Sequence, residues 1–221
     1  MKDSKLIALF RSLDKKELRD LGKWLRSPFF NQRADVEQLF EYLKKNLGKE
    51  EEPLDKPVLF QALYPNETYQ DAKMRHVMSF LLQQIKDYLA YQYWQSKPFE
   101  QEIATAAAMR QHSQDLLFQQ TVNALTDALH SAQNRTHFRH FYNYQVNLEQ
   151  YRASLKKSRI KAMNLQQVAD ALTVFYVCET LRINCLMIAH QRVTGYEYEP
   201  KMLAEVLDQA TSPPLVALPE V

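Results

Sequence analysis

Glycine is almost absent from this chain of 221 residues, which contains only Gly22, Gly48 and Gly195. Glycine supplies the backbone conformations that tight turns between strands need, so its scarcity disfavours a β-sheet protein. No stretch alternates apolar and polar residues between glycine turns, whereas apolar residues recur at helical spacing. The sequence therefore predicts an all-α fold of many helices. The three glycines also lie too far apart to form a phosphate-binding loop.

Cysteine is scarce too, and long uncharged apolar runs are missing. Cys178 and Cys185 lie two turns apart on one expected helix, roughly 10 Å, which is too far for a disulfide. They indicate small buried residues of a reduced, cytoplasmic protein. The opening "MKDSKLIALF" has no apolar leader, and Glu179, Arg182 and Asn184 interrupt the most apolar helix. We therefore expect a soluble protein without a membrane partner.

No arrangement of polar residues matches a known catalytic or metal motif. The sequence has no G-x-S-x-G nucleophile elbow, no readable carboxylate pair and no His-Glu-x-x-His. His137 and His140 have a spacing compatible with shared metal ligation and His130 is close in sequence, but no further ligand accompanies them. Ordinary surface or interface histidines are the favoured interpretation. We expect no metal, no cofactor and no enzymatic activity.

The apolar periodicity divides the chain into two parts. Residues 1–97 are expected to form a compact helical domain, in which Asp14 and Glu17 form a capping box and Asn31 caps the helix from Ala34. Residues 98–221 have longer helices with short connections, which is typical of antiparallel helical hairpins. The expected helices are 4–13, 15–27, 34–47, 56–64 and 71–95 in the first part, and 99–113, 115–133, 136–155, 164–194 and 200–210 in the second.

The expected helix 164–194 is apolar on two faces. One holds Leu165, Val168, Leu172, Phe175, Ile183, Leu186 and Met187, and the rest of the circumference holds Val174, Val177, Cys178, Leu181, Cys185 and Ile188. Such a helix is packed by neighbours on most sides, so we expect it at the centre of the second part. The succession of helices suggests a tetratricopeptide-like repeat there, although the signature residues are missing. The tail "TSPPLVALPEV" indicates a chain cut from a longer protein at its C-terminus.

Two stretches, "LRSPFFN" at 25–31 and "LFQALYPNETYQDAKMRHVMSFLLQQIKDYL" at 59–89, resemble the N-terminal part of a group of uncharacterised bacterial all-helical proteins. The resemblance implies a helical domain that continues beyond this chain and supplies no catalytic residues. Residues 59–89, within a helix-turn-helix-like segment 57–95, are also similar in outline to the winged helix-turn-helix of bacterial transcriptional activators, with Leu63, Tyr64 and Pro65 at the turn. No wing hairpin follows, because the helix from Asp71 runs on toward Trp94.

Two sets of polar residues are candidates for contact with a nucleic acid or another anion. The first set shares the polar face of the helix 71–89 and consists of Arg75, His76, Ser79, Gln83 and Lys86. The second set lies in "YRASLKKSRIKAM" and consists of Arg152, Lys156, Lys157, Arg159 and Lys161. A solvated helix face is the favoured explanation of the first set, and a helix C-terminus, whose dipole favours cations, is the favoured explanation of the second.

The leading functional hypothesis is a non-enzymatic scaffold that binds another protein, or a helix of its own kind, through helical grooves. Aromatic residues are enriched at interfaces, so Phe29, Phe30, Phe80 and Trp94 are the expected anchors. The alternative is a DNA-binding regulator that uses the helix 71–89. The formal net charge of only +2 disfavours this alternative, because nucleic-acid binders usually carry a strong basic excess. The sequence leaves open the partner, the oligomeric state and the biological process.

Overall fold

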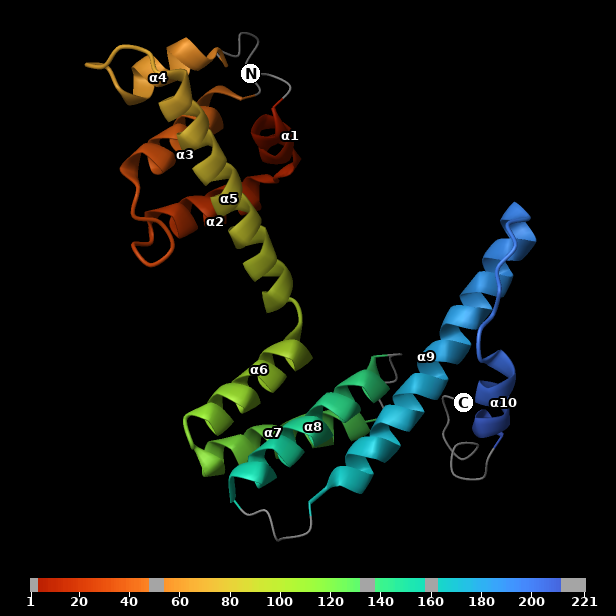
Figure 1. Ribbon diagram of the computed structural model, residues 1–221. Coiled ribbons are helices and arrows are strands. Elements are labelled where there is room, and N and C mark those ends of the chain that lie inside the picture. Colours follow the sequence, from red (N-terminus) through yellow and green to blue (C-terminus); the bar gives the residue numbers. More distant parts are fainter. Residues whose placement is uncertain (1–3, 48–53, 132–137, 158–162, 212–221) are drawn as a thin grey trace. The chain divides into compact units, whose positions relative to one another are not determined.

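The structure is a computed structural model that describes residues 4–47, 54–131, 138–157 and 163–211. Across these ranges the regular secondary structure is entirely helical, which confirms the all-α class. The chain divides into two compact units, Met1–Ser96 (unit 1) and Lys97–Val221 (unit 2), which are described separately below (Figure 1).

Unit 1 contains five helices whose ends follow local sequence signals. They are α1 (Lys5–Ser12), α2 (Lys15–Arg26), α3 (Ala34–Asn46), α4 (Lys56–Leu63) and α5 (Asp71–Gln95). The expected capping box is present: the Glu17 amide donates to Asp14 Oδ1 (2.7 Å) and the Asp14 amide donates to Glu17 Oε2 (2.8 Å). The expected cap at Asn31 is wrong, because Arg33 precedes α3 and the helix has no side-chain cap.

The long helix α5 is the centre of unit 1, and α1, α2, α3 and α4 all pack against it (Figure 1). Met74, Val77, Leu81 and Ile85 repeat at steps of three and four residues and are completely buried. They meet a core that α1 and α3 supply with Ile7, Leu39 and other apolar residues. This apolar arc of α5 is therefore the face against which the other helices of unit 1 pack.

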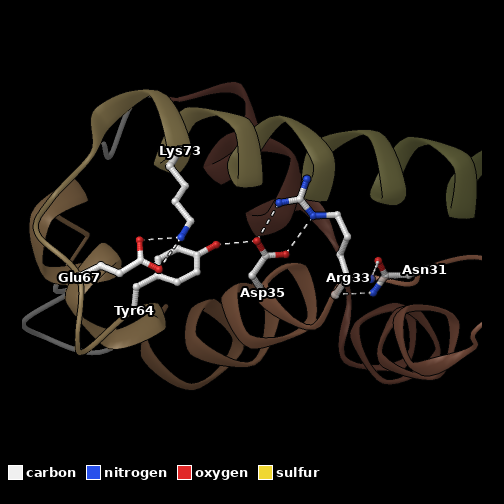
Figure 2. A network of polar contacts seen from close by, with 6 residues as sticks. All are labelled: Asn31, Arg33, Asp35, Tyr64, Glu67 and Lys73. Carbon is white, nitrogen blue, oxygen red and sulfur yellow. Dashed lines mark hydrogen bonds and ion pairs between the residues drawn. The ribbon is translucent and has the colours of Figure 1, made fainter.

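A polar network fixes the turn between α4 and α5 to the start of α3 (Figure 2). The guanidinium of Arg33 makes a bidentate contact with Asp35 (3.0 and 2.7 Å), and the Tyr64 hydroxyl donates to Asp35 Oδ2 (2.5 Å). Lys73 lies over the Tyr64 ring at 3.7 Å and pairs with Glu67 at 2.6 Å. These contacts give the helix-turn-helix outline of residues 57–95 a structural explanation that involves no nucleic acid.

Unit 2 is built from consecutive helices that pack as hairpins. They are α6 (Pro98–Gln111), α7 (Asp115–His130), α8 (Arg139–Lys157), α9 (Leu165–Thr194) and α10 (Leu203–Ala210). Phe118, Val122 and Leu125 of α7 lie in the core that α6, α7 and α8 share. Arg110 of α6 donates to the buried Glu149 of α8 at 2.8 Å, which adds a polar tie between these helices.

The expectation that α9 is packed on most sides is wrong. Ala171, Val177 and Asn184 are the buried residues of α9, whereas Leu186 is 54% exposed and Val193 is 85% exposed. Within unit 2, α8 and α10 pack against α9, and the chain that leads to α10 runs beside its C-terminal half (Figure 1). The apolar composition of a helix shows which faces it is able to bury. Whether those faces are buried depends on the other helices that pack against it.

Two further expectations stay predictions. The hairpins of unit 2 are compatible with a helical repeat, which stays a prediction. The tail that suggested a longer protein lies outside the described residues from position 212 onward.

Candidate protein-interaction surface

Five aromatic side chains form a continuous cluster at the surface of unit 1, here called the aromatic cluster: the half-buried Trp24 and the exposed Phe29, Phe30, Tyr91 and Trp94. The rings of Trp24 and Phe30 are stacked, with 3.5 Å between centroids and 12° between planes. Phe29 meets Phe30 edge-on at 5.0 Å, and Tyr91 lies 5.4 Å from Trp24 and 6.2 Å from Trp94. Phe29 is 87% exposed, which is a large apolar side chain left in water.

The turn that follows α2 presents Phe29 and Phe30, and Asn31 holds this turn. Its side-chain amide donates to the carbonyls of Leu25 (2.9 Å) and Arg33 (3.0 Å), and its side-chain oxygen accepts from the Arg33 amide (3.0 Å). An asparagine side chain can replace missing backbone partners in this way, so the turn is closed without a glycine. The exposed Phe29 and Phe30 therefore lie on a turn that the hydrogen bonds of Asn31 hold in place.

The cluster borders an open groove of about 800 Å³ between α2 and the C-terminal part of α5. Its lining includes Lys16, Lys23, Trp24, Phe30, Tyr88 and Tyr91. Tyr88 is nearly fully buried, and burial of its hydroxyl raises its pKa above the ordinary value of a tyrosine. The Trp24 indole donates to Gln84 of α5 at 2.9 Å, which fixes the ring that connects the two helices. The groove thus has rigid aromatic walls and lysines among its lining residues.

Sequence reasoning identified part of this surface and missed the rest. Of the four expected anchors, Phe29, Phe30 and Trp94 belong to the cluster. Phe80 is also exposed, but it lies three turns before Tyr91 on α5, roughly 16 Å along the helix axis. There it contacts the Arg33 guanidinium (4.4 Å) and the His76 ring (4.9 Å).

Trp24 and Tyr91 were not among the expected anchors. The available signal was a tryptophan near the end of α2, placed shortly before a turn that contains two adjacent phenylalanines. Only the packing of α2 on α5 shows that these rings meet Tyr91, which is distant in the sequence.

The polar face of α5 is exposed as expected, with Arg75, His76, Ser79, Gln83 and Lys86 all at the surface. Arg75 pairs with Asp71 at 2.8 Å, and Gln83 donates to Asp87 at 2.7 Å. Hydrogen bonds from Lys56 and Tyr69 hold the pKa of the Asp71 carboxyl below its ordinary value, so the first turn of α5 presents an ionised acid. Recognition helices contact bases with their N-terminal residues, so this acid disfavours DNA. DNA binding stays a prediction.

The second cationic set is only partly described. Arg152 pairs with Glu149, the same carboxylate that Arg110 contacts, so its charge takes part in the packing of α6 and α8. Lys156 and Lys157 lie at the end of α8, and nothing further is described of their side chains. Arg159 and Lys161 lie outside the described residues, as does His137. Anion binding by this set stays a prediction.

Unit 2 contains a smaller cavity of about 350 Å³ among α7, α8 and α9. Its polar lining includes His130, Arg139, His140 and Asp170. Within the described ranges of the chain, no three histidine, cysteine, aspartate or glutamate residues are arranged to hold a metal ion. Glu179 and Arg182, which interrupt the apolar sequence of α9, pair with each other.

Comparison with known proteins does not identify a relative of this chain. No family model, no curated protein and no solved structure matches the chain. The resemblance to uncharacterised bacterial helical proteins therefore stays a prediction, and the function is argued from the surface alone.

Proposed function

We propose that this chain is a non-enzymatic helical scaffold that binds another protein through the aromatic cluster and its groove on unit 1. The observation that supports this proposal is the exposure of Phe29 on an ordered turn, in contact with Phe30, which itself stacks on Trp24. Stacked aromatic side chains supply large apolar area with few rotatable bonds, and such side chains dominate binding energy at interfaces. Contiguous exposed apolar patches with a polar rim are typical of interaction sites.

The chemistry of the groove fits an extended, proline-rich segment. Flat aromatic walls complement the faces of proline rings, and the polyproline II conformation leaves its carbonyl groups without internal partners. Side-chain donors at the groove, which include Lys16, Gln92 and Gln95, can bind those carbonyls. We therefore expect a partner that carries such a segment, and we expect the contact to take place in the reducing cytoplasm.

A fluorescein-labelled decaproline peptide tests this proposal by fluorescence anisotropy against the whole chain. We expect saturable binding with a dissociation constant on the order of 100 μM, because one short peptide engages a small area. Phe29→Ser should weaken binding at least about fivefold, since it removes an exposed anchor and leaves the core intact. The matched control is Phe138→Ser, which removes a half-exposed phenylalanine of unit 2 and should leave the affinity unchanged.

A labelled amphipathic helical peptide serves as the second probe. If neither peptide binds, a protein-binding groove at the aromatic cluster is contradicted. It is also contradicted if a peptide binds and Phe29→Ser leaves its affinity unchanged. If the helical peptide binds more tightly, the groove is still a protein-binding site, but its ligand is a helix and not a proline-rich segment.

A further inference from the structure

A cavity of about 370 Å³ lies in unit 2 between α9 and the chain that leads from α9 to α10. This chain, residues 196–202, is here called the return segment, and it runs beside the C-terminal half of α9 (Figure 1). The cavity is lined by Glu179, Thr180, Ile183, Asn184, Met187, Glu199 and Lys201. Small-molecule sites in proteins have volumes from about 300 Å³ upward, so this cavity is large enough for a small ligand.

The return segment is attached to α9 beyond both ends of this cavity. On the C-terminal side, the Tyr198 hydroxyl lies 2.8 Å from Nδ1 of His190. On the N-terminal side, the Tyr176 hydroxyl donates to the sulfur of Met202 at 3.0 Å. Between these two contacts, α9 and the return segment form the two walls of the cavity.

Asn184 is the buried polar residue of this cavity, and only 4% of its surface is exposed. Its side-chain nitrogen donates to the Thr180 carbonyl at 2.8 Å, within α9. This bond fixes the orientation of the amide, because only the nitrogen can donate. The side-chain oxygen, which is an acceptor, has no hydrogen-bond partner among the described residues. A buried acceptor without a partner costs free energy, so a ligand that brings a donor to Asn184 is stabilised in this cavity.

The charged residues of the lining determine the charge of that ligand. Glu179 has its charge balanced by Arg182, whose Nε donates to it at 2.9 Å. Glu199 and Lys201 add one further charge of each sign, and both belong to the return segment. Residues two apart in an extended segment point to the same side, in agreement with their common place in the lining. A ligand with an ammonium for Asn184 and Glu199, and a carboxylate for Lys201, therefore complements this wall.

The opposite wall of the cavity is apolar, because Ile183 and Met187 lie one turn apart on α9. An amino acid carries an ammonium, a carboxylate and a side chain on a single carbon, and these three groups match the acceptors, the lysine and the apolar wall. We propose that this cavity binds a free amino acid with an aliphatic side chain of the size of leucine. Its ammonium donates to Asn184 Oδ1 and to Glu199, its carboxylate accepts from Lys201, and its side chain packs on α9.

The return segment is the part of this site that moves when the ligand enters. The Asn184 oxygen is buried, and the return segment contains no helix or strand that would resist a small shift. A small ligand that makes few contacts binds weakly, so we expect a dissociation constant on the order of 1 mM. The proposal does not depend on the aromatic cluster, which belongs to unit 1.

The length and apolar composition of α9 would also allow it to cross a membrane. Two observations favour the cavity over a lipid environment. Glu179 and Arg182 pair with each other near the middle of α9, and α8, α10 and the return segment all contact this helix. A bilayer would have to displace these neighbours and enclose a charged pair.

Heteronuclear NMR of the isotope-labelled whole chain, titrated with L-leucine up to about 20 mM, tests the proposal. We expect saturable shifts of the backbone amide signals of Glu199 and Lys201 and of the side-chain amide signal of Asn184. Phe29→Ser should leave these shifts intact, which separates this result from failure of the aromatic groove.

Two analogues of leucine separate the charged contacts. Isocaproate lacks the ammonium and isoamylamine lacks the carboxylate, so each should bind at least about fivefold more weakly than leucine. Lys201→Met should weaken leucine binding about fivefold and leave isoamylamine binding unchanged, because isoamylamine has no carboxylate for Lys201 to bind.

Asn184→Leu is the decisive variant, because it separates ligand binding from a structural role. It should raise the dissociation constant of leucine more than about tenfold, read from the Glu199 and Lys201 signals. The melting temperature should stay the same or rise, because the variant removes a buried acceptor that has no partner. The matched control is Gln191→Leu, an exposed amide two turns further along α9 and outside the cavity, which should change the affinity less than about twofold.

Four outcomes overturn the proposal of an amino-acid site. The first is the absence of saturable shifts up to about 20 mM leucine, in which case water alone satisfies the Asn184 oxygen. The second is binding of isocaproate or isoamylamine as tight as that of leucine. The third is an unchanged affinity for leucine in Asn184→Leu. The fourth is co-flotation of the chain with phosphatidylcholine vesicles, because the return segment would then have to leave α9.

Discussion

Asp35 accepts hydrogen bonds from two side chains of unit 1, Arg33 and Tyr64. Burial alone would raise the pKa of its carboxyl, but the hydrogen bonds from Arg33 and Tyr64 outweigh burial and hold the pKa below its ordinary value. Burial and the bond to Asp35 in turn raise the pKa of the Tyr64 hydroxyl far above its ordinary value, so this hydroxyl remains a donor. A single carboxylate therefore connects the start of α3 to the turn before α5.

Removal of the Tyr64 hydroxyl tests the strength of this connection. Tyr64→Phe should lower the free energy of unfolding by about 1 to 2 kcal/mol, because a half-buried, charge-assisted hydrogen bond is lost while Arg33 still pairs with Asp35. Urea unfolding followed by circular dichroism gives the value. The matched control is Tyr69→Phe, whose hydroxyl contacts Asp71 at the surface, and it should show no measurable change. Equal effects of the two variants would contradict a special role for the Asp35 contact.

The lowered pKa of Asp35 also predicts how stability depends on pH. The folded-state pKa lies below the unfolded-state value of about 3.9, so the ionised carboxylate favours the folded state. This contribution is fully present above about pH 4 and is lost as the pH falls through the folded-state pKa. Asp35→Asn should therefore make the urea midpoint less dependent on pH between about pH 4 and about pH 2. The exposed Asp55→Asn is the control, and it should keep the steeper wild-type dependence.

At the scale of helices, local signals were predictable and contacts between distant segments were not. The capping box of α2 depends on residues three apart, Asp14 and Glu17, so the sequence alone is sufficient to predict it. Asn31 has the right residue type for a helix cap, but its amide is better satisfied by the carbonyls of Leu25 and Arg33, a choice that depends on how the turn closes. The apolar arc of α5 was predictable because its period matches a helix.

For α9 and the aromatic cluster, too, contacts between distant segments were not predictable from the sequence. The two apolar faces of α9 were recognisable in the sequence, but composition alone did not distinguish a face covered within the chain from one that is left exposed. Phe29 and Phe30 could be identified as anchors from their residue type. Trp24 and Tyr91 join them only through the packing of α2 on α5, which no local pattern encodes.

At the scale of the whole molecule, unit 1 has a core of its own, to which α1, α2, α3, α4 and α5 all contribute. A domain of this size can bury enough apolar surface to fold independently. We therefore expect a fragment of residues 1–97 to unfold in one cooperative urea transition, with a slope of about 1 to 1.5 kcal/mol per molar urea. A fragment of residues 1–84 is the control: it lacks Ile85 and Tyr88, both buried in the core, and should fail to fold. A gradual, non-cooperative transition of the longer fragment would contradict an autonomous unit 1.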